Sequence, residues 1–235
     1  MDRQLKKVAK TDELTESLGQ VVGFSSEHLP QLKKYGPIAL GVLVIAAGIY
    51  FFVHHQATVR EEALADALKV DDATVGANPN PSLMHFDTAD QKAQAVQKAY
   101  AEVASKYHGT QEGAIAQMNL VQTAVDKGDT VGAEKQLKDL IDSAPTAYAS
   151  QASITLANLY RVQGKYPDAE KILNDLVKSP TVTVSKEEAL LALARVKMHT
   201  DPKEAQRILS DLRTSRTVIS RAAMNALAEL QGAGQ

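Results

Sequence analysis

The sequence predicts an all-α protein made of one apolar helix near the N-terminus followed by a short solenoid of repeated helix pairs. Three observations indicate this fold class. No side chain in residues 38–53 is charged, and from Ala89 onward apolar residues recur at helical spacing. Within that second region, one pattern of large, small and glycine positions recurs along the chain. Gly and Pro interrupt it mostly where helices have to end.

The composition excludes several classes of protein. The 235 residues include 26 Lys and Arg against 28 Asp and Glu, a net charge of −2, and 44% are hydrophobic. This supplies enough apolar material for a core. A nucleic-acid-binding protein needs a basic face, so we expect no nucleic-acid partner. Because the chain has no Cys, disulfides, thiolate nucleophiles and cysteine-based metal sites are excluded.

The uncharged segment 35–59 is long enough to cross a membrane. At about 1.5 Å per residue it would extend roughly 37 Å as a helix, against a hydrocarbon core of about 30 Å. Pro37 suits the first turn of a helix. The alternatives are a helix buried in a soluble core, for which the rest of the chain offers little mass, and a cleaved signal peptide, which rarely has so long a preceding tail. We predict a single transmembrane helix at 35–59, in contact with the lipid bilayer.

The charges that flank this segment predict its orientation. Lys33 and Lys34 lie directly before it, whereas acidic residues predominate in residues 61–72. Because Lys and Arg are enriched on the cytoplasmic side, we expect a cytoplasmic N-terminus and an extracytoplasmic C-terminal domain. In a bacterium with two membranes, this is a single-pass protein of the inner membrane with a periplasmic domain.

Changes in composition divide the chain into five regions. Alternating Asn and Pro at 78–81 exclude a helix or a central strand there. Gly41 and Gly48 share one face of the apolar helix and are candidates for packing against a partner helix in the membrane. The predicted regions are a cytoplasmic tail at 1–34, the transmembrane helix at 35–59, a helical stalk at 60–70, a linker at 71–88 and a repeat domain at 89–235.

The clearest repeat lies in residues 151–180. The pattern recurs about 36 residues earlier, around Gly128, and in more degenerate form about 36 residues later, around Ala205. We therefore predict three repeats between two single helices, one at 91–107 and one near the C-terminus. An unrelated helical bundle with coincidental spacing is the alternative. The residues of the clearest repeat that match the tetratricopeptide pattern are Leu156, Ala157, Tyr160, Gly164, Tyr166, Ala169, Leu173, Leu176 and Pro180.

One membrane helix followed by a short, degenerate tetratricopeptide-like domain resembles the bacterial ancillary subunit family of the SecYEG translocon. The resemblance rests on the apolar helix and on segments 99–110, 125–141 and 160–173. It implies a non-catalytic adaptor whose extracytoplasmic domain links translocon subunits to periplasmic chaperones or secreted client chains. The alternative is a structural or assembly subunit of another membrane protein complex.

The sequence contains no candidate catalytic, cofactor-binding or metal-binding residues. His54 and His55 are adjacent, and adjacent side chains on a helix point about 100° apart, so the two cannot jointly hold a metal. Motifs of zinc proteases, serine hydrolases and phosphate-binding loops are absent from the sequence. We expect a protein that is not an enzyme and that needs no cofactor.

Stacked helix pairs create a concave face from the first helix of each pair. A mixture of flexible apolar side chains, amides and cations at these positions suits an extended or helical peptide. The dense clamp by which some related repeats hold a terminal carboxylate is missing, because Asn158 has no neighbouring Lys on its face. Ordinary packing or a solvated surface is the alternative for each position. The candidate groove residues are Met118, Gln122, Ile154, Asn158, Arg161, Leu190, Lys197 and Met198.

Overall fold

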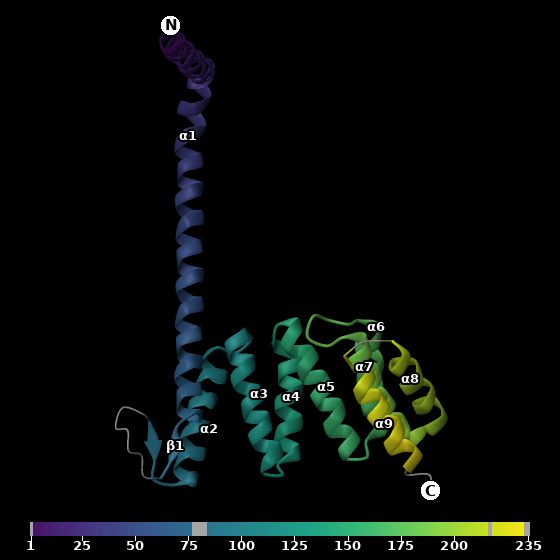
Figure 1. Ribbon diagram of the computed structural model, residues 1–235. Coiled ribbons are helices and arrows are strands. Elements are labelled where there is room, and N and C mark those ends of the chain that lie inside the picture. The colour runs from purple at the N-terminus through teal and green to yellow at the C-terminus, as the bar shows by residue number, and fades with distance from the viewer. Residues whose placement is uncertain (1, 77–83, 216–217, 233–235) are drawn as a thin grey trace. The chain divides into compact units, whose positions relative to one another are not determined.

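The predicted all-α fold class is confirmed. The computed structural model describes residues 2–76, 84–215 and 218–232, and it describes side chains from position 35 onward apart from positions 36 and 39. These residues form nine α-helices and two strands of two residues each. Figure 1 shows a long first helix followed by a series of shorter ones.

The long helix α1 (Asp2–Asp71) contains the predicted tail, apolar segment and stalk. Strands β1 (Thr74–Val75) and β2 (His85–Phe86) pair in parallel within the predicted linker. The Asn and Pro alternation at 78–81 lies outside the described residues. The remaining helices are α2 (Ala89–Lys106), α3 (Gln111–Asp126), α4 (Thr130–Ser143), α5 (Thr146–Val162), α6 (Tyr166–Lys178), α7 (Lys186–Thr200), α8 (Pro202–Thr214) and α9 (Ser220–Gly232).

The chain divides into two compact units, residues 1–58 and 59–235. In the first unit the apolar side chains are exposed, as for Ile45 at 64% and Phe52 at 65%. Within the described part of the chain, α1 is the one helix that is long and apolar enough to cross a membrane. A core helix of a soluble protein would bury these side chains, so their exposure argues against that alternative.

The end of α1, residues 59–71, belongs to the second unit and packs against α2. Leu64 is buried in one cluster with Tyr100, and the Tyr100 hydroxyl donates a hydrogen bond to Asp71 Oδ2 at 2.9 Å. The prediction of a single helix at 91–107 is therefore wrong, because α2 is the second helix of a pair. The sequence concealed this pair because its two helices are separated by a segment far longer than the turn inside the other pairs.

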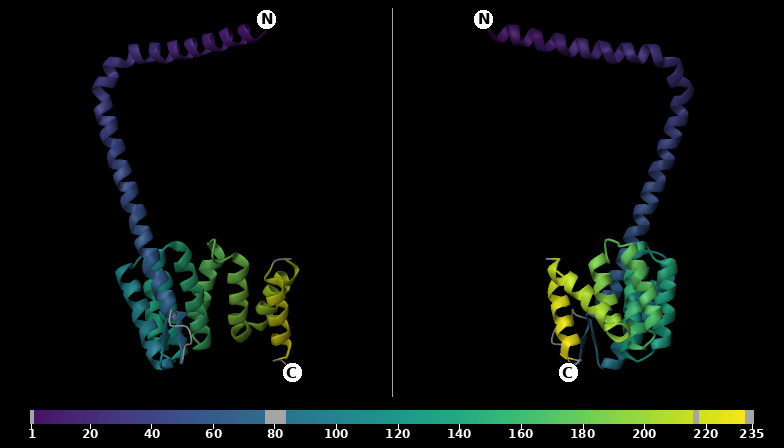
Figure 2. Two further views of the ribbon diagram at one scale, coloured as in Figure 1. Left: turned by 60° about the vertical axis from the view of Figure 1, so that its left-hand side comes forward. Right: turned by 90° about the vertical axis from the view of Figure 1, so that its right-hand side faces the viewer.

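Three further pairs follow, α3 with α4, α5 with α6 and α7 with α8, and α9 packs on the last of them. The views in Figures 1 and 2 show these helices side by side. Gly128 and Gly164 have φ angles of +76° and +73°, the left-handed conformation that glycine adopts readily after a helix. The pair of α7 and α8 has no turn glycine. There Asp201 caps α8 by accepting a hydrogen bond from the Glu204 backbone N–H at 3.1 Å.

Small residues at equivalent positions let the helices of each pair approach closely. Ala133, Ala169 and Ala205 are all fully buried, as the repeat pattern predicts. Helix packing brings axes to about 8–10 Å when the contact side chains are small, so a larger residue at these positions would force the pair apart. The leucines one turn later are also buried in every repeat: Leu137, Leu173 and Leu209.

Candidate protein-binding face

The first helices of successive pairs, α3, α5 and α7, lie next to one another, and α9 continues the row beside α7. We call the solvent-facing side of these four helices the first-helix face. It contains the positions from which a solenoid of helix pairs usually contacts a ligand. The candidate groove residues all come from α3, α5 and α7.

Several of these residues have a packing role in the structure. Met118, Ile154 and Leu190 are partly buried and pack against the main hydrophobic core, so only part of each is available to a partner. Gln122 is exposed, and its Nε2 donates a hydrogen bond to Asp126 Oδ1 at 2.8 Å. Three of these positions therefore have a packing role, and Gln122 contributes exposed surface.

Lys197 is held by a carboxylate of the preceding pair. Its Nζ lies 2.6 Å from Glu170 Oε2, and the Thr200 hydroxyl donates to Glu170 Oε1, also at 2.6 Å. Burial raises the pKa of Glu170, but the hydrogen bonds from Lys197 and Thr200 outweigh burial, so the pKa lies below its ordinary value. Lys197 thus joins α7 to α6, and its charge is neutralised within the domain.

The remaining candidates are Asn158, Arg161 and Met198, and two of them line a pocket. Asn158 is partly buried on α5, one turn before Arg161. Arg161 and Met198 line a pocket of about 370 Å³ that is formed by α5, α7 and α9. We call it the arginine pocket. Its lining residues are Arg161, Arg195, Met198, His199, Glu229 and Leu230.

The arginine pocket contains residues that the sequence analysis missed. Arg195 lies one turn before Met198 and His199 on α7, so helical spacing from Met198 could have identified it. Glu229 and Leu230 come from α9, which the sequence predicted only as a single helix near the C-terminus. The His199 ring stacks on Tyr166, with centroids 5.0 Å apart and planes 13° apart, and this contact orients the imidazole.

The charges of the arginine pocket are not neutralised within the domain. Arg161 Nε is buried and has no hydrogen-bond partner. Neither Arg161, Arg195 nor Glu229 has an oppositely charged atom of a described residue within 4.0 Å. With two guanidinium groups and one carboxylate, the pocket carries a net positive charge before His199 is considered.

The repeat explains why Arg161 has no carboxylate partner. Arg161 and Lys197 occupy equivalent positions about 36 residues apart, and the carboxylate equivalent to Glu170 is Glu134. Hydrogen bonds from Lys138 and Lys165 lower the pKa of Glu134 to about 2, so this carboxylate is charged and already occupied. Its donors are Lys138 Nζ at 2.8 Å, the Tyr160 hydroxyl at 3.0 Å and Lys165 Nζ at 3.1 Å.

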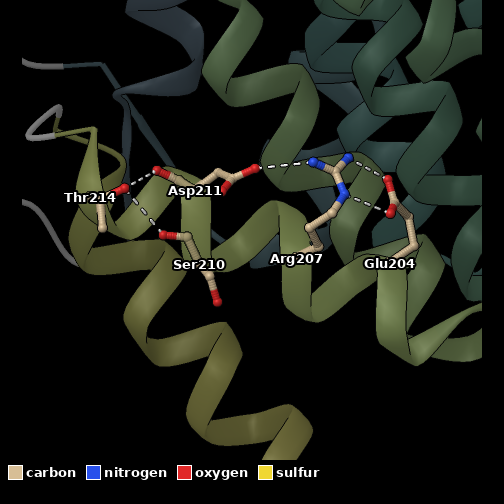
Figure 3. A network of polar contacts seen from close by, with 5 residues as sticks. All are labelled: Glu204, Arg207, Ser210, Asp211 and Thr214. Atoms are coloured by element: carbon tan, nitrogen blue, oxygen red, sulfur yellow. Dashed lines mark hydrogen bonds and ion pairs between the residues drawn. The ribbon is translucent and has the colours of Figure 1, made fainter.

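Leu190 lines a different pocket, of about 400 Å³, between α7 and α8. Arg207 lies at its edge and is held by two carboxylates on its own helix, as Figure 3 shows. Its guanidinium nitrogens lie 2.7 Å from Glu204 Oε1 and 3.1 Å from Asp211 Oδ2. Because these bonds occupy the guanidinium, this pocket has no equivalent of the unpaired arginines on the first-helix face.

Stacked helix pairs with equivalent buried alanines define an α-solenoid of short helical repeats, a class whose members present extended binding surfaces. The chain belongs to the tetratricopeptide repeat-like domain family, whose model matches residues 32–179. No curated protein and no solved structure matches the chain. Domains of this family are typically non-catalytic interaction modules. The family match therefore indicates protein partners.

Proposed function

We propose that this protein is a membrane-anchored, non-catalytic adaptor whose repeat domain binds other proteins. The combination of an exposed apolar helical segment with a tetratricopeptide repeat-like domain supports this function. An apolar segment of this length is stable in a hydrocarbon environment, and stacked helix pairs provide a surface for extended partners. The chain would thus hold a protein-binding domain at a membrane.

The expected membrane is the bacterial inner membrane, crossed once by residues 35–59, with the N-terminus in the cytoplasm. Lys33 and Lys34 before the segment support this orientation. The resemblance to the ancillary SecYEG subunit family supports translocon subunits, periplasmic chaperones or secreted client chains as partners. In this arrangement, the repeat domain in the periplasm meets client chains as they leave the translocon.

Site-specific photocrosslinking in cells tests these partners. A photoreactive amino acid at position 122 lies on the exposed first-helix face, and the matched control position 206 is exposed on α8. We expect translocon subunits, chaperones or client chains to be crosslinked from position 122 and not from position 206. Equal crosslinking from both positions, or no protein crosslinked from either, would contradict the proposed binding face.

Reporter fusions test the topology separately. A C-terminal alkaline phosphatase is active only outside the cytoplasm, whereas a C-terminal green fluorescent protein that is exported through the Sec translocon does not fluoresce. We expect phosphatase activity without fluorescence. The opposite result would place the repeat domain in the cytoplasm and would remove periplasmic chaperones from the partner list.

A structural or assembly subunit of another membrane complex is the second candidate function, and one observation favours it. A Cβ built at Gly41 or Gly48 would meet no atom within 4 Å, so the side of α1 that carries both glycines is open to a partner helix. We expect the double variant Gly41→Leu with Gly48→Leu to release the chain from such a complex on native gels, whereas Leu43→Ile, on the opposite side of the helix, should not. Unchanged migration of both variants, with translocon subunits still crosslinked, would favour the adaptor.

A further inference from the structure

The arginine pocket has the composition of a binding site for an anion next to an aliphatic group. Arg161 comes from α5 and Arg195 from α7, so two guanidinium groups reach the pocket from neighbouring repeats. Neither forms an ion pair with a described residue. Arg161 Nε is covered by protein atoms and has no acceptor, so a ligand oxygen would bind this guanidinium through its terminal nitrogens.

The apolar part of the pocket limits the ligand further. Met198 and Leu230 are partly buried and line the pocket from α7 and α9. A methionine side chain adapts to aliphatic groups of different shape, which suits a partner segment of variable sequence. Glu229 contributes a negative charge and leaves the two arginines a net charge of about +1, so the pocket neutralises a single carboxylate better than a densely charged ligand such as a nucleic acid or a multiply phosphorylated segment.

We propose that the arginine pocket binds the carboxylate side chain of an Asp or Glu in a partner protein, with an adjacent aliphatic side chain against Met198 and Leu230. Guanidinium groups match carboxylates in geometry and form charge-assisted hydrogen bonds. The inference rests on the proposed function, since its ligand is a segment of a bound protein. The contact between this carboxylate and the arginine pocket would determine which proteins the first-helix face binds.

A terminal carboxylate is a poorer occupant of this face. Repeats that hold a chain end combine an amide with lysine ammonium groups, and Asn158 is the available amide on α5. The one ammonium among the candidate groove residues is that of Lys197 on the next first helix, α7, and it is bound to Glu170 at 2.6 Å. Acidic side chains within a segment therefore remain as the ligands that the free arginines select.

Affinity selection with the full-length protein in detergent micelles tests this proposal. The probe is a library of short random peptides that are acetylated at the N-terminus and amidated at the C-terminus, so that only side chains carry charge. We expect the retained peptides to be enriched in Asp or Glu beside Leu, Ile, Val or Met. In one retained peptide, labelled for fluorescence anisotropy, replacing the acidic residue by its amide should lower affinity about tenfold.

Variants of the protein connect this selectivity to the pocket. Arg195 is exposed, so Arg195→Gln should fold normally and lower affinity for the acidic peptide about tenfold, with no further loss for the amide peptide. Glu229→Gln removes the competing carboxylate and should raise affinity severalfold. Lys171→Gln on α6 removes the same charge outside the pocket and is the matched control. Circular dichroism confirms that each variant is folded.

The outcomes separate this inference from the adaptor function. Retention of peptides without acidic enrichment, or equal affinities of Arg195→Gln and Lys171→Gln, would overturn the carboxylate pocket and leave a protein-binding adaptor. In a second set of peptides with uncharged side chains and a free C-terminus, binding tighter than that of the amidated acidic peptide would show that a chain end is the ligand, which also overturns the inference. If the wild-type protein retained no peptide while crosslinking from position 122 also failed, both the inference and the proposed function would be wrong.

Discussion

The Tyr160 hydroxyl on α5 donates a hydrogen bond to the Glu134 carboxylate on α4, with 3.0 Å between the two oxygen atoms. Lys165, in the turn after α5, binds the same carboxylate at 3.1 Å. A single side chain thus joins the second helix of one pair to both the first helix and the turn of the next pair. Glu170 has the equivalent role one repeat later, where Lys197 is its partner.

We predict that Glu134→Gln destabilises the repeat domain. The substitution keeps the shape of the side chain and removes the charge that three donors bind. Hydrogen bonds to charged groups contribute about 1.5–3 kcal/mol when well shielded, and partial exposure reduces this, so we expect a loss of about 1–2 kcal/mol in urea unfolding at neutral pH. Glu102→Gln is the control, because Glu102 is exposed and its nearest partner, Lys98, is 4.0 Å away; a comparable loss there would contradict the assignment.

The same bonds predict a pH dependence. The pKa of Glu134 is lowered from 4.5 to about 2 in the folded protein, so the charged form is favoured by folding. The contribution of the Glu134 carboxylate to folding stability is complete above the pKa of the unfolded chain. It is lost as the pH falls toward the pKa of the folded protein. The stability difference between wild type and Glu134→Gln should therefore shrink between pH 4.5 and about 2. A difference that stayed constant over this range would show that the charge of Glu134 is not involved.

Tyr100→Phe tests the contact between α2 and the end of α1. The substitution removes the hydrogen bond to Asp71 and keeps the buried ring, so we expect a loss of about 0.5–1.5 kcal/mol by thermal unfolding. Tyr148→Phe is the control, because the Tyr148 hydroxyl bonds to no described residue and its removal should have little effect. Equal losses for the two variants would show that the Asp71 contact contributes nothing specific.

Alkaline unfolding gives a second test at Tyr100. Burial and the hydrogen bond to Asp71 raise the pKa of Tyr100 above its ordinary value of 10.0, so the hydroxyl ionises more readily in the unfolded chain. The hydrogen bond therefore stabilises the folded protein fully below the unfolded pKa of 10.0, and this contribution is lost as the pH rises above that value. We expect Tyr100→Phe to weaken this alkaline loss, and a variant with the wild-type pH profile would contradict the expectation.

Gly113→Ala should destabilise the start of α3. A Cβ at this position would clash with the Tyr107 carbonyl oxygen, and that backbone atom cannot move without shifting the connection between α2 and α3. We expect a loss of about 3 kcal/mol in thermal unfolding, at the upper end for overpacking. The same substitution at Gly232, where a Cβ meets nothing within 4 Å, should be neutral. If Gly113→Ala were equally neutral, the close approach of the two segments would be wrong.

Ile45→Arg tests the membrane anchor. A positive charge near the middle of a membrane-spanning helix costs about 2.5–3.5 kcal/mol on insertion scales, so a larger fraction of the protein should be extracted from membranes by alkaline carbonate. Ile45→Leu should remain in the membrane fraction. Extraction of the wild-type protein and both variants to the same extent would contradict an anchor at this segment.

The sequence predicted the parts of the fold that depend on local pattern. The turn glycines and the equivalent alanines follow from short-range rules, because a left-handed turn and a close helix contact each restrict one residue type. The pairing of α2 with the end of α1 could not be predicted in this way, since it depends on a contact across residues 72–88. Helical periodicity identifies an apolar face but not the helix that covers it.

The arginine pocket was only partly predictable for a related reason. Arg161 and Met198 follow from their places on the first helices, but the partner of a charged side chain depends on the neighbouring pair. Spacing alone made Lys197 and Arg161 equivalent. The structure distinguishes them, because Glu170 is free to bind Lys197 whereas Glu134 is already bound by Tyr160 and two lysines.

The pairing of Leu64 with Tyr100 has a consequence for proteolysis. A protease that cut the peptide chain between β1 and β2 would leave residues 59–71 on one fragment and α2 on the other. Because these helices share a buried cluster and the hydrogen bond between Tyr100 and Asp71, the two fragments should stay together as a nicked complex. Separating the repeat domain from the fragment that carries residues 1–71 would then require denaturant as well as cleavage.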